Sequence, residues 1–331
     1  MSSIYRLFGA ENSPFSVKVR SYFRYKAIPH EWIVRDGNSM AAFQQYAKLP
    51  LIPLLVTPDD EAFQDSTPMI ERIESLHPNP SIHPEDETTA FMSALLEEFG
   101  DEWGNKWMLH FRWAREADQV AASRRLVDEM MPELPEEKRV GMAQGIAERM
   151  IGRVWFVGSN QKTAAQIEDS WEQGLALLED HLARRPFLFG RRPAFADFAL
   201  WGQIYNASLD PTPGGILRQN APSVLEWVNR MLEPKSGGDF EGWPSLAPTL
   251  APFVKAMCGD LFLPWSDANA KALVTGEEYE VELDGRIWTQ KPVKYQAKSL
   301  IAIRKKYAAV SGNVELNQVL EAAGCLRWLR H

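Results

Sequence analysis

The sequence is poor in cysteine and has no long uninterrupted apolar run. Only two of its 331 residues are cysteines, Cys258 and Cys325, and neither belongs to a CxxC or zinc-binding pattern. A disulfide framework is therefore excluded, and we expect a chain from a reducing, cytoplasmic compartment. Apolar runs such as Leu49–Val56 are much shorter than the roughly 18–20 residues of a membrane-spanning helix. Because the N-terminus also lacks a basic segment followed by an apolar one, we expect neither a secretory signal nor a membrane protein.

Positive charge is also scarce. The chain has 36 Lys and Arg against 44 Asp and Glu, which gives a net charge of −8. Nucleic acids and anionic membranes both bind basic surfaces, so neither is expected as the main partner. The six histidines lack metal-ligand spacing, and the sequence contains no HExxH, P-loop, GxGxxG or GxSxG motif. We therefore expect no metal site.

The first 80 residues alternate the patterns of strand and helix. A helix between two strands implies a right-handed parallel unit, and the turn at Thr57–Asp60 implies a hairpin that adds an antiparallel strand beside it. These patterns predict an α/β domain over residues 1–80. Strand patterns occur at 4–8, 31–34, 51–56 and 62–64, and helical patterns at 14–27, at 39–47 and from 67 onwards.

A proline-rich linker at 78–86 precedes an almost entirely helical segment, which predicts an all-helical domain over 87–257. Residues 260–331 differ in character. Glu278–Leu283 alternates apolar and acidic residues, Asp284-Gly285 supplies a two-residue turn, and the chain returns over 286–290. This pattern is a strong hairpin signal. With two helices, expected near 295–307 and 314–323, it predicts a small α+β extension.

Three motifs of the first domain occur at turns between strands and helices. SPFSVKVR at 13–20, IPLL at 52–55 and Asp65-Ser66 resemble, in order and spacing, the thioredoxin-like domain of the cytosolic glutathione transferases. FGRRPAFAD at 189–197 resembles the segment that opens the sixth helix of that family's all-helical domain. The resemblance covers about residues 3–257 and implies a thioredoxin-like domain followed by a helical bundle. It also implies that glutathione is the co-substrate.

The resemblance places thiol activation at the turn that contains Ser13. A hydroxyl or amide that donates a hydrogen bond to sulfur, at the N-terminus of a helix, lowers the pKa of the thiol and stabilises the thiolate. Asn12 is the alternative, because in some serine classes the active residue lies two positions before Pro14. Ser followed by Pro is also a good helix start without any ligand. Phe15 belongs to the same motif and is expected beside glutathione, whereas Tyr5 is expected to pack in the core.

The other two motifs are expected to hold the glutathione backbone. In the family the proline that matches Pro53 is cis, so that Ile52 pairs with the cysteinyl part of glutathione. Asp65 and Ser66 would face the γ-glutamyl end, with the free N–H groups of the following helix. Some transferases carry a lysine at the position of Leu51, and Lys48 is a possible substitute here.

Two features of the helical domain complete the expected site. Trp103, Trp107 and Phe111 follow helical spacing, and in the family this helix helps to wall the pocket of the apolar second substrate. The same spacing is also typical of a core stripe. Asp197 is expected to be a buried acid that caps a helix, although Ala194 replaces the usual Ser or Thr of the capping box.

The resemblance thus implies a glutathione transferase whose bound thiolate attacks a small hydrophobic electrophile without a metal. It also implies a homodimer, unless the extension covers the dimer interface. No cysteine occurs in residues 1–257, which disfavours the thiol-reductase chemistry of family members with Cys at position 13. A non-catalytic protein that binds a partner or a hydrophobic ligand is the alternative. Leu51, Asp65 and the long tail favour this alternative.

Overall fold

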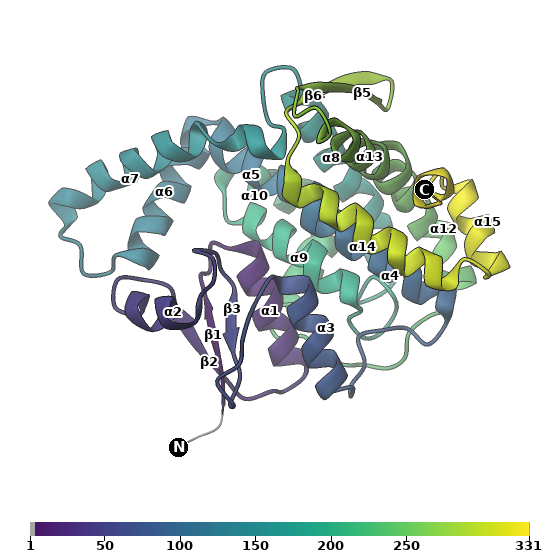
Figure 1. Cartoon of the computed structure of the whole chain (residues 1–331), viewed down its shortest axis with the longest axis horizontal. Helices are drawn as coiled ribbons and strands as arrows, with labels where there is room; N and C mark the ends of the chain where they lie inside the picture. Colours follow the sequence, from purple (N-terminus) through teal and green to yellow (C-terminus); the bar gives the residue numbers. More distant parts are fainter. Residues whose placement is uncertain (1–3, 331) are drawn as a thin grey trace.

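The N-terminal part of the chain forms a four-stranded mixed sheet flanked by helices (Figure 1). The structure is a computed structural model that describes residues 4–330. The strand order is β2-β1-β3-β4, with β1 and β2 parallel and the other neighbours antiparallel. The predicted parallel unit and adjoining hairpin are therefore confirmed. The elements are β1 (Tyr5–Gly9), α1 (Pro14–Tyr25), β2 (His30–Val34), α2 (Met40–Tyr46), β3 (Leu54–Val56), β4 (Ala62–Gln64) and α3 (Ser66–Leu76).

Helix α1 joins the sheet to the helical domain. Ser13 caps its first turn, and Pro14 occupies the first helical position, where a missing N–H costs nothing. Val19, Tyr22 and Phe23, which follow helical spacing, are fully buried. Tyr5 packs edge-on against Phe23 with their ring centroids 5.4 Å apart, in agreement with its predicted packing role.

The second part of the chain is a helical bundle, as predicted. Its first helix runs through α4, the π-helical η1 and α5, and it ends before Arg115, whose backbone is extended. Helices α6 and α7 form a hairpin that projects from the bundle and lies above α2 in the view of Figure 1. The elements are α4 (Glu87–Phe99), η1 (Gly100–Gly104), α5 (Asn105–Ala114), α6 (Glu116–Met130), α7 (Glu136–Ile151), η2 (Val154–Val157), α8 (Ala164–Leu182), α9 (Phe195–Ser208), α10 (Pro211–Asn220) and α11 (Pro222–Arg230).

Asp197 stabilises the start of α9, as expected. Its buried carboxylate accepts hydrogen bonds from the N–H groups of Leu188 (2.9 Å) and Ala194 (2.8 Å) and from the Trp227 indole (2.9 Å). Burial raises the pKa of Asp197 to about 7, although these hydrogen bonds lower it. Ala194 has no side-chain oxygen, so only the Asp197 half of the capping box is made through a side chain.

A single continuous helix of 30 residues, Trp243–Ala272, follows. The boundary expected at 257–260 lies inside this helix, so the structure has no linker between the helical domain and the extension. The helix is long and apolar enough to cross a membrane, but 61% of its most apolar window is buried inside the protein, as in a core helix. Its parts and the later elements are α12 (Trp243–Phe253), η3 (Val254–Phe262), α13 (Leu263–Ala272), β5 (Tyr279–Leu283), β6 (Arg286–Gln290), α14 (Lys294–Val310), α15 (Val314–Ala322) and α16 (Leu326–Leu329).

The extension shares the core of the helical domain. Lys106 on α5 is fully buried, and its Nζ lies 3.5 Å from the Trp265 ring centroid and 5.2 Å from that of Trp288. Trp103 packs against the same two rings at 5.9 and 5.4 Å. Burial lowers the pKa of Lys106 well below its usual value, against the opposing charge of Glu102. The hairpin and α13 are therefore docked around a buried aromatic cluster.

Helix α14 then crosses in front of α4 and packs against it, with α3 below it in the view (Figure 1). The Ser299 hydroxyl donates to the buried carboxylate of Glu98, and Lys306 Nζ lies 2.8 Å from a carboxylate oxygen of Glu71. These contacts join the extension to both the helical bundle and the N-terminal unit. The start of α14 consequently lies next to the Asp65-Ser66 motif.

Candidate functional site

A cavity of about 440 Å³ brings together the three motifs of the N-terminal unit. This volume is within the range of small-molecule sites. The Ile52–Pro53 peptide bond is cis, as the resemblance implied. The predicted site residues that line the cavity are Phe15, Ile52, Pro53, Asp65 and Ser66.

Ser66 contributes an unpaired hydroxyl to this cavity. The residue is the first of α3 and is only 3% exposed, and its hydroxyl has no hydrogen-bond partner among residues 4–330. The N–H groups of Ser66 and Thr67 have no acceptor within the helix, because they belong to its first turn. Asp65, which precedes the helix, has φ of +82°, a conformation that a non-glycine residue adopts at a cost. Together these features form a small concave site suited to an anion.

Gln64 holds the loop that leads to Pro53. Its side-chain oxygen accepts from the N–H groups of Lys48 (2.9 Å) and Leu49 (3.0 Å), and its amide nitrogen donates to the carbonyl of Leu51 (2.7 Å). Lys48 is exposed and lies outside the residues that line the cavity, whereas Leu51 lines it. The structure therefore does not place the Lys48 ammonium at the site, and the cavity wall at this point is apolar.

Ser13 lies at the N-terminus of α1, two residues before Phe15 on the cavity wall. Its hydroxyl accepts from the Ser16 N–H (3.3 Å) and from the Ser16 hydroxyl (3.0 Å). Both bonds use the oxygen of Ser13 as acceptor, so its own hydroxyl hydrogen is not committed to a partner among the described residues. Ser13 is half-buried and is not among the residues that line the 440 Å³ cavity.

Asn12, the alternative to Ser13, is held by the helical domain. Its amide nitrogen donates to Glu129 (2.8 Å), and its side-chain oxygen accepts from Arg125 (3.2 Å). Its carbonyl accepts from Arg112 (3.0 Å), and the N–H of Glu11 donates to Glu129. Both ends of the Asn12 amide are occupied, so the structure assigns it to positioning the turn between β1 and α1.

The aromatic stripe of the helical domain faces the core. Trp103, Trp107 and Phe111 are all at most 1% exposed, and none of them lines a described cavity. Both indole N–H groups donate to the buried Ser170 hydroxyl, at 3.2 and 2.7 Å. The expectation that these rings face a second substrate is therefore corrected. The three rings pack against residues of α8 and of the extension. The stripe is therefore part of the core.

Residues of the helical domain and of the extension also line the cavity. They come from η1 and α5 on one side and from η2 and the extension on the other. The Tyr295 hydroxyl at the start of α14 donates to the Asp65 carboxylate at 3.0 Å, so the extension forms part of the wall. Among these residues, only the adjacent acids Asp101 and Glu102 carry a sequence signal of a site, because they interrupt an apolar helix pattern. These additional residues are Asp101, Glu102, Asn105, Phe156, Val293, Tyr295, Gln296 and Lys298.

Asp101 belongs to a buried ion-pair network beneath the cavity. Lys18 Nζ lies 2.6 Å from both Asp101 and Glu97, and it also donates to the Thr67 hydroxyl at 3.1 Å. Burial raises the pKa of Asp101 to about 6, although Lys18 lowers it. The network joins α1, α3 and α4, and it leaves no free cation from Lys18 for a ligand.

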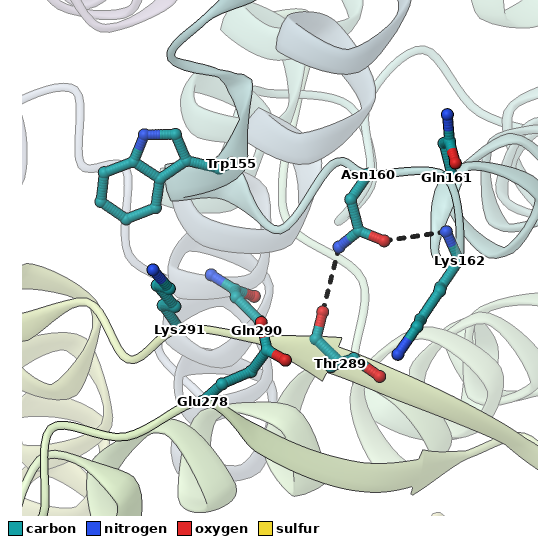
Figure 2. Close-up of a pocket in the computed structure, with 8 residues that line it drawn as sticks. All are labelled: Trp155, Asn160, Gln161, Lys162, Glu278, Thr289, Gln290 and Lys291. Carbon is teal, nitrogen blue, oxygen red and sulfur yellow. Dashed lines mark hydrogen bonds between the residues drawn. The ribbon is translucent and has the colours of Figure 1, made fainter.

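A second cleft, of about 580 Å³, lies between the α7–α8 connection and the hairpin (Figure 2). The Asn160 amide donates to the Thr289 carbonyl at 3.0 Å, and its side-chain oxygen accepts from the Lys162 N–H at 2.8 Å. These bonds hold the connection against β6. None of the predicted site residues lines this cleft.

The described residues offer no group of three or more His, Cys, Asp or Glu that could hold a metal ion. Cys258 and Cys325 are free and buried, and burial raises the pKa of both thiols. Neither thiol lines the 440 Å³ cavity.

Two family models match the chain. The model described as "Glutathione S-transferase, N-terminal domain" matches residues 7–81, and "Glutathione S-transferase, C-terminal domain" matches 161–230. No curated protein sequence matches.

Solved structures are similar at low identity. A glutathione S-transferase from Methylobacterium radiotolerans in complex with glutathione sulfonate has 20% identity and a TM-score of 0.43, over 75% of this chain and 94% of that one. A Tau class glutathione S-transferase from mango has 17% identity and a TM-score of 0.41, over 76% and 98%. Glutaredoxin 2 from Salmonella typhimurium in complex with glutathione has 16% identity and a TM-score of 0.41, over 70% and 100%.

Proposed function

We propose that this chain, which belongs to the glutathione S-transferase superfamily, binds glutathione in the 440 Å³ cavity and transfers its thiolate to an electrophile. The observation that carries the proposal is the convergence of all three motifs on one cavity, where Ser66 presents an unpaired hydroxyl. A carboxylate of glutathione would accept from this hydroxyl and from the free N–H groups of α3. Ile52, Pro53 and Phe15 would form the wall beside the cysteinyl part.

Ser13 is the group we propose for activation of the thiol. Its hydroxyl hydrogen is uncommitted, whereas the Asn12 amide is bonded at both ends. A hydrogen bond from Ser13 to sulfur at the N-terminus of α1 would stabilise the thiolate. The second substrate remains a small hydrophobic electrophile, for which the cavity provides apolar walls at Leu49, Leu51 and Phe156.

Replacement of Ser66 by alanine tests the glutathione site. We expect the dissociation constant of glutathione to rise about tenfold or more, because a hydrogen bond to a charged group contributes about 1.5–3 kcal/mol. Isothermal titration calorimetry measures this change. Ser75→Ala is the matched control, because Ser75 lies at the exposed end of the same helix and bonds only the Arg72 carbonyl. Equal affinity of the Ser66 variant and the wild type would contradict the proposed binding mode.

Assays of the wild type distinguish a transferase from a protein that only binds glutathione. Conjugation of glutathione to an electrophile, together with ionisation of the bound thiol, is the expected result. Binding without ionisation would favour the non-catalytic alternative. A homodimer and a cytoplasmic, detoxifying role remain proposals from the family membership, and light scattering after size-exclusion chromatography measures the first of these.

A further inference from the structure

Glu102 is a buried acid that lines the cavity. Its side chain belongs to the π-helical segment η1, is only 7% exposed, and lines both the 440 Å³ cavity and an adjoining one of about 250 Å³. Among residues 4–330, no group hydrogen-bonds to its carboxyl. A buried polar group usually has a partner, so this carboxyl points to an interaction with a bound molecule.

The surroundings of Glu102 favour its neutral form. Burial raises the pKa of Glu102 to about 8, and the neighbouring charges of Asp101, Asp65 and Glu97 act in the same direction. Lys106 opposes them but is itself enclosed by tryptophan rings. Tyr295 and Lys298 of α14 line the cavity from the other side, and Tyr295 is bonded to Asp65.

We propose that Glu102 is a general acid that donates a proton to the electrophile during attack by the glutathione thiolate. This inference rests on the proposed function and names its substrate class: electrophiles in which attack creates an oxyanion, such as α,β-unsaturated carbonyl compounds and epoxides. A carboxylic acid kept neutral by burial can serve this role near neutral pH.

Every proton and electron pair of the proposed step is accounted for within one turnover. With an unsaturated ketone, the thiolate forms a C–S bond at the β-carbon, and the electron pair of the C=C bond moves to form the enolate. The Glu102 proton passes to the enolate, which leaves the neutral adduct and a Glu102 carboxylate. The proton released when the next glutathione thiol ionises restores the acid. Displacement of chloride from an aryl chloride needs no such proton, because chloride leaves as an anion.

Glu102→Gln tests the assignment with two substrates. Glutamine retains the shape and can donate a hydrogen bond, but it cannot transfer a proton. We expect kcat/KM for methyl vinyl ketone to fall about 100-fold more than kcat/KM for chlorodinitrobenzene, so that the ratio of the two activities reports the loss of the acid. In the wild type, the rate with the ketone should decline as the pH rises through about 8, because Glu102 then loses its proton. The variant should lack this decline.

Glu98→Gln is the matched control, since it removes a buried carboxyl one turn earlier that is bonded to Ser299. Its activity towards both substrates should match that of the wild type. Equal losses with both substrates in Glu102→Gln, or no loss with either, would overturn the assignment and leave the proposed function intact. Wild-type conjugation of the aryl chloride without conjugation of the ketone would overturn it as well. Absence of glutathione binding by the wild type would instead refute the proposed function, and the inference with it.

Discussion

Replacing Trp288 with alanine is expected to lower the free energy of unfolding by about 3–5 kcal/mol, the usual cost of truncating a buried tryptophan. Trp288 lies on β6, is fully buried and packs 5.4 Å from Trp103 of the helical domain. Its removal would leave a cavity beside the buried Lys106, whose Nζ lies 5.2 Å from the Trp288 ring centroid. The extension would then lose this aromatic contact with the bundle. Chemical denaturation followed by circular dichroism measures the change.

Ile287→Ala is the control for this prediction. Ile287 precedes Trp288 on the same strand but is 51% exposed, so its truncation should cost less than about 1 kcal/mol. A small effect in both variants would show that the extension folds independently of the helical domain. A large effect in Trp288→Ala alone would establish that residues 263–330 are part of one cooperative unit.

Replacing Ser13 with alanine is expected to lower kcat/KM for conjugation about 100-fold, in line with the removal of a single hydrogen bond to a developing or bound anion. Lowering the pKa of a thiol from about 8.5 to about 6.5 requires about 2.7 kcal/mol. One charge-assisted hydrogen bond and the N-terminus of α1 can supply this energy. The ultraviolet absorbance of the thiolate, measured against pH with bound glutathione, reports the pKa directly. In the variant this pKa should return towards that of free glutathione.

The capping role of Ser13 requires a separate control. Its oxygen accepts from the Ser16 N–H, so alanine also removes a helix cap worth about 1 kcal/mol. Ser13→Asp keeps a capping acceptor but has no hydrogen to donate at neutral pH. Retained stability with lost thiolate formation in this variant would support activation by Ser13. Full activity of Ser13→Ala would exclude Ser13 as the activating group.

Local patterns predicted much of the fold. The turn at Asp284-Gly285 joins β5 to β6, and both residues have positive φ, 48° and 71°, as a two-residue hairpin turn requires. The start of α1 follows from Ser13-Pro14, and the mixed sheet follows from the order of strand and helix patterns. In each case the deciding interactions occur between residues close in the sequence.

The candidate site was predicted only in part. Phe15, Ile52, Pro53, Asp65 and Ser66 line one cavity, and they belong to motifs with a recognisable order and spacing. The position of Asn12 depends on residues more than 100 positions away, and periodicity carries no information about such contacts. The stripe of Trp103, Trp107 and Phe111 has the same spacing whether it faces a ligand or the core, so only its neighbours distinguish the two.

The sequence by itself determined the class of most elements, the turns between them and the motifs whose residues line one cavity, because short-range sterics, hydrogen bonding and apolar periodicity act along the chain. Only the tertiary structure decided that α14 completes the cavity wall, that the aromatic stripe packs inwards, and that Glu102 is buried without a hydrogen-bond partner among the described residues. These features arise from the docking of the extension onto the bundle, in which residues about 200 positions apart exclude water from the same space. Burial of this kind depends on all the neighbouring segments together.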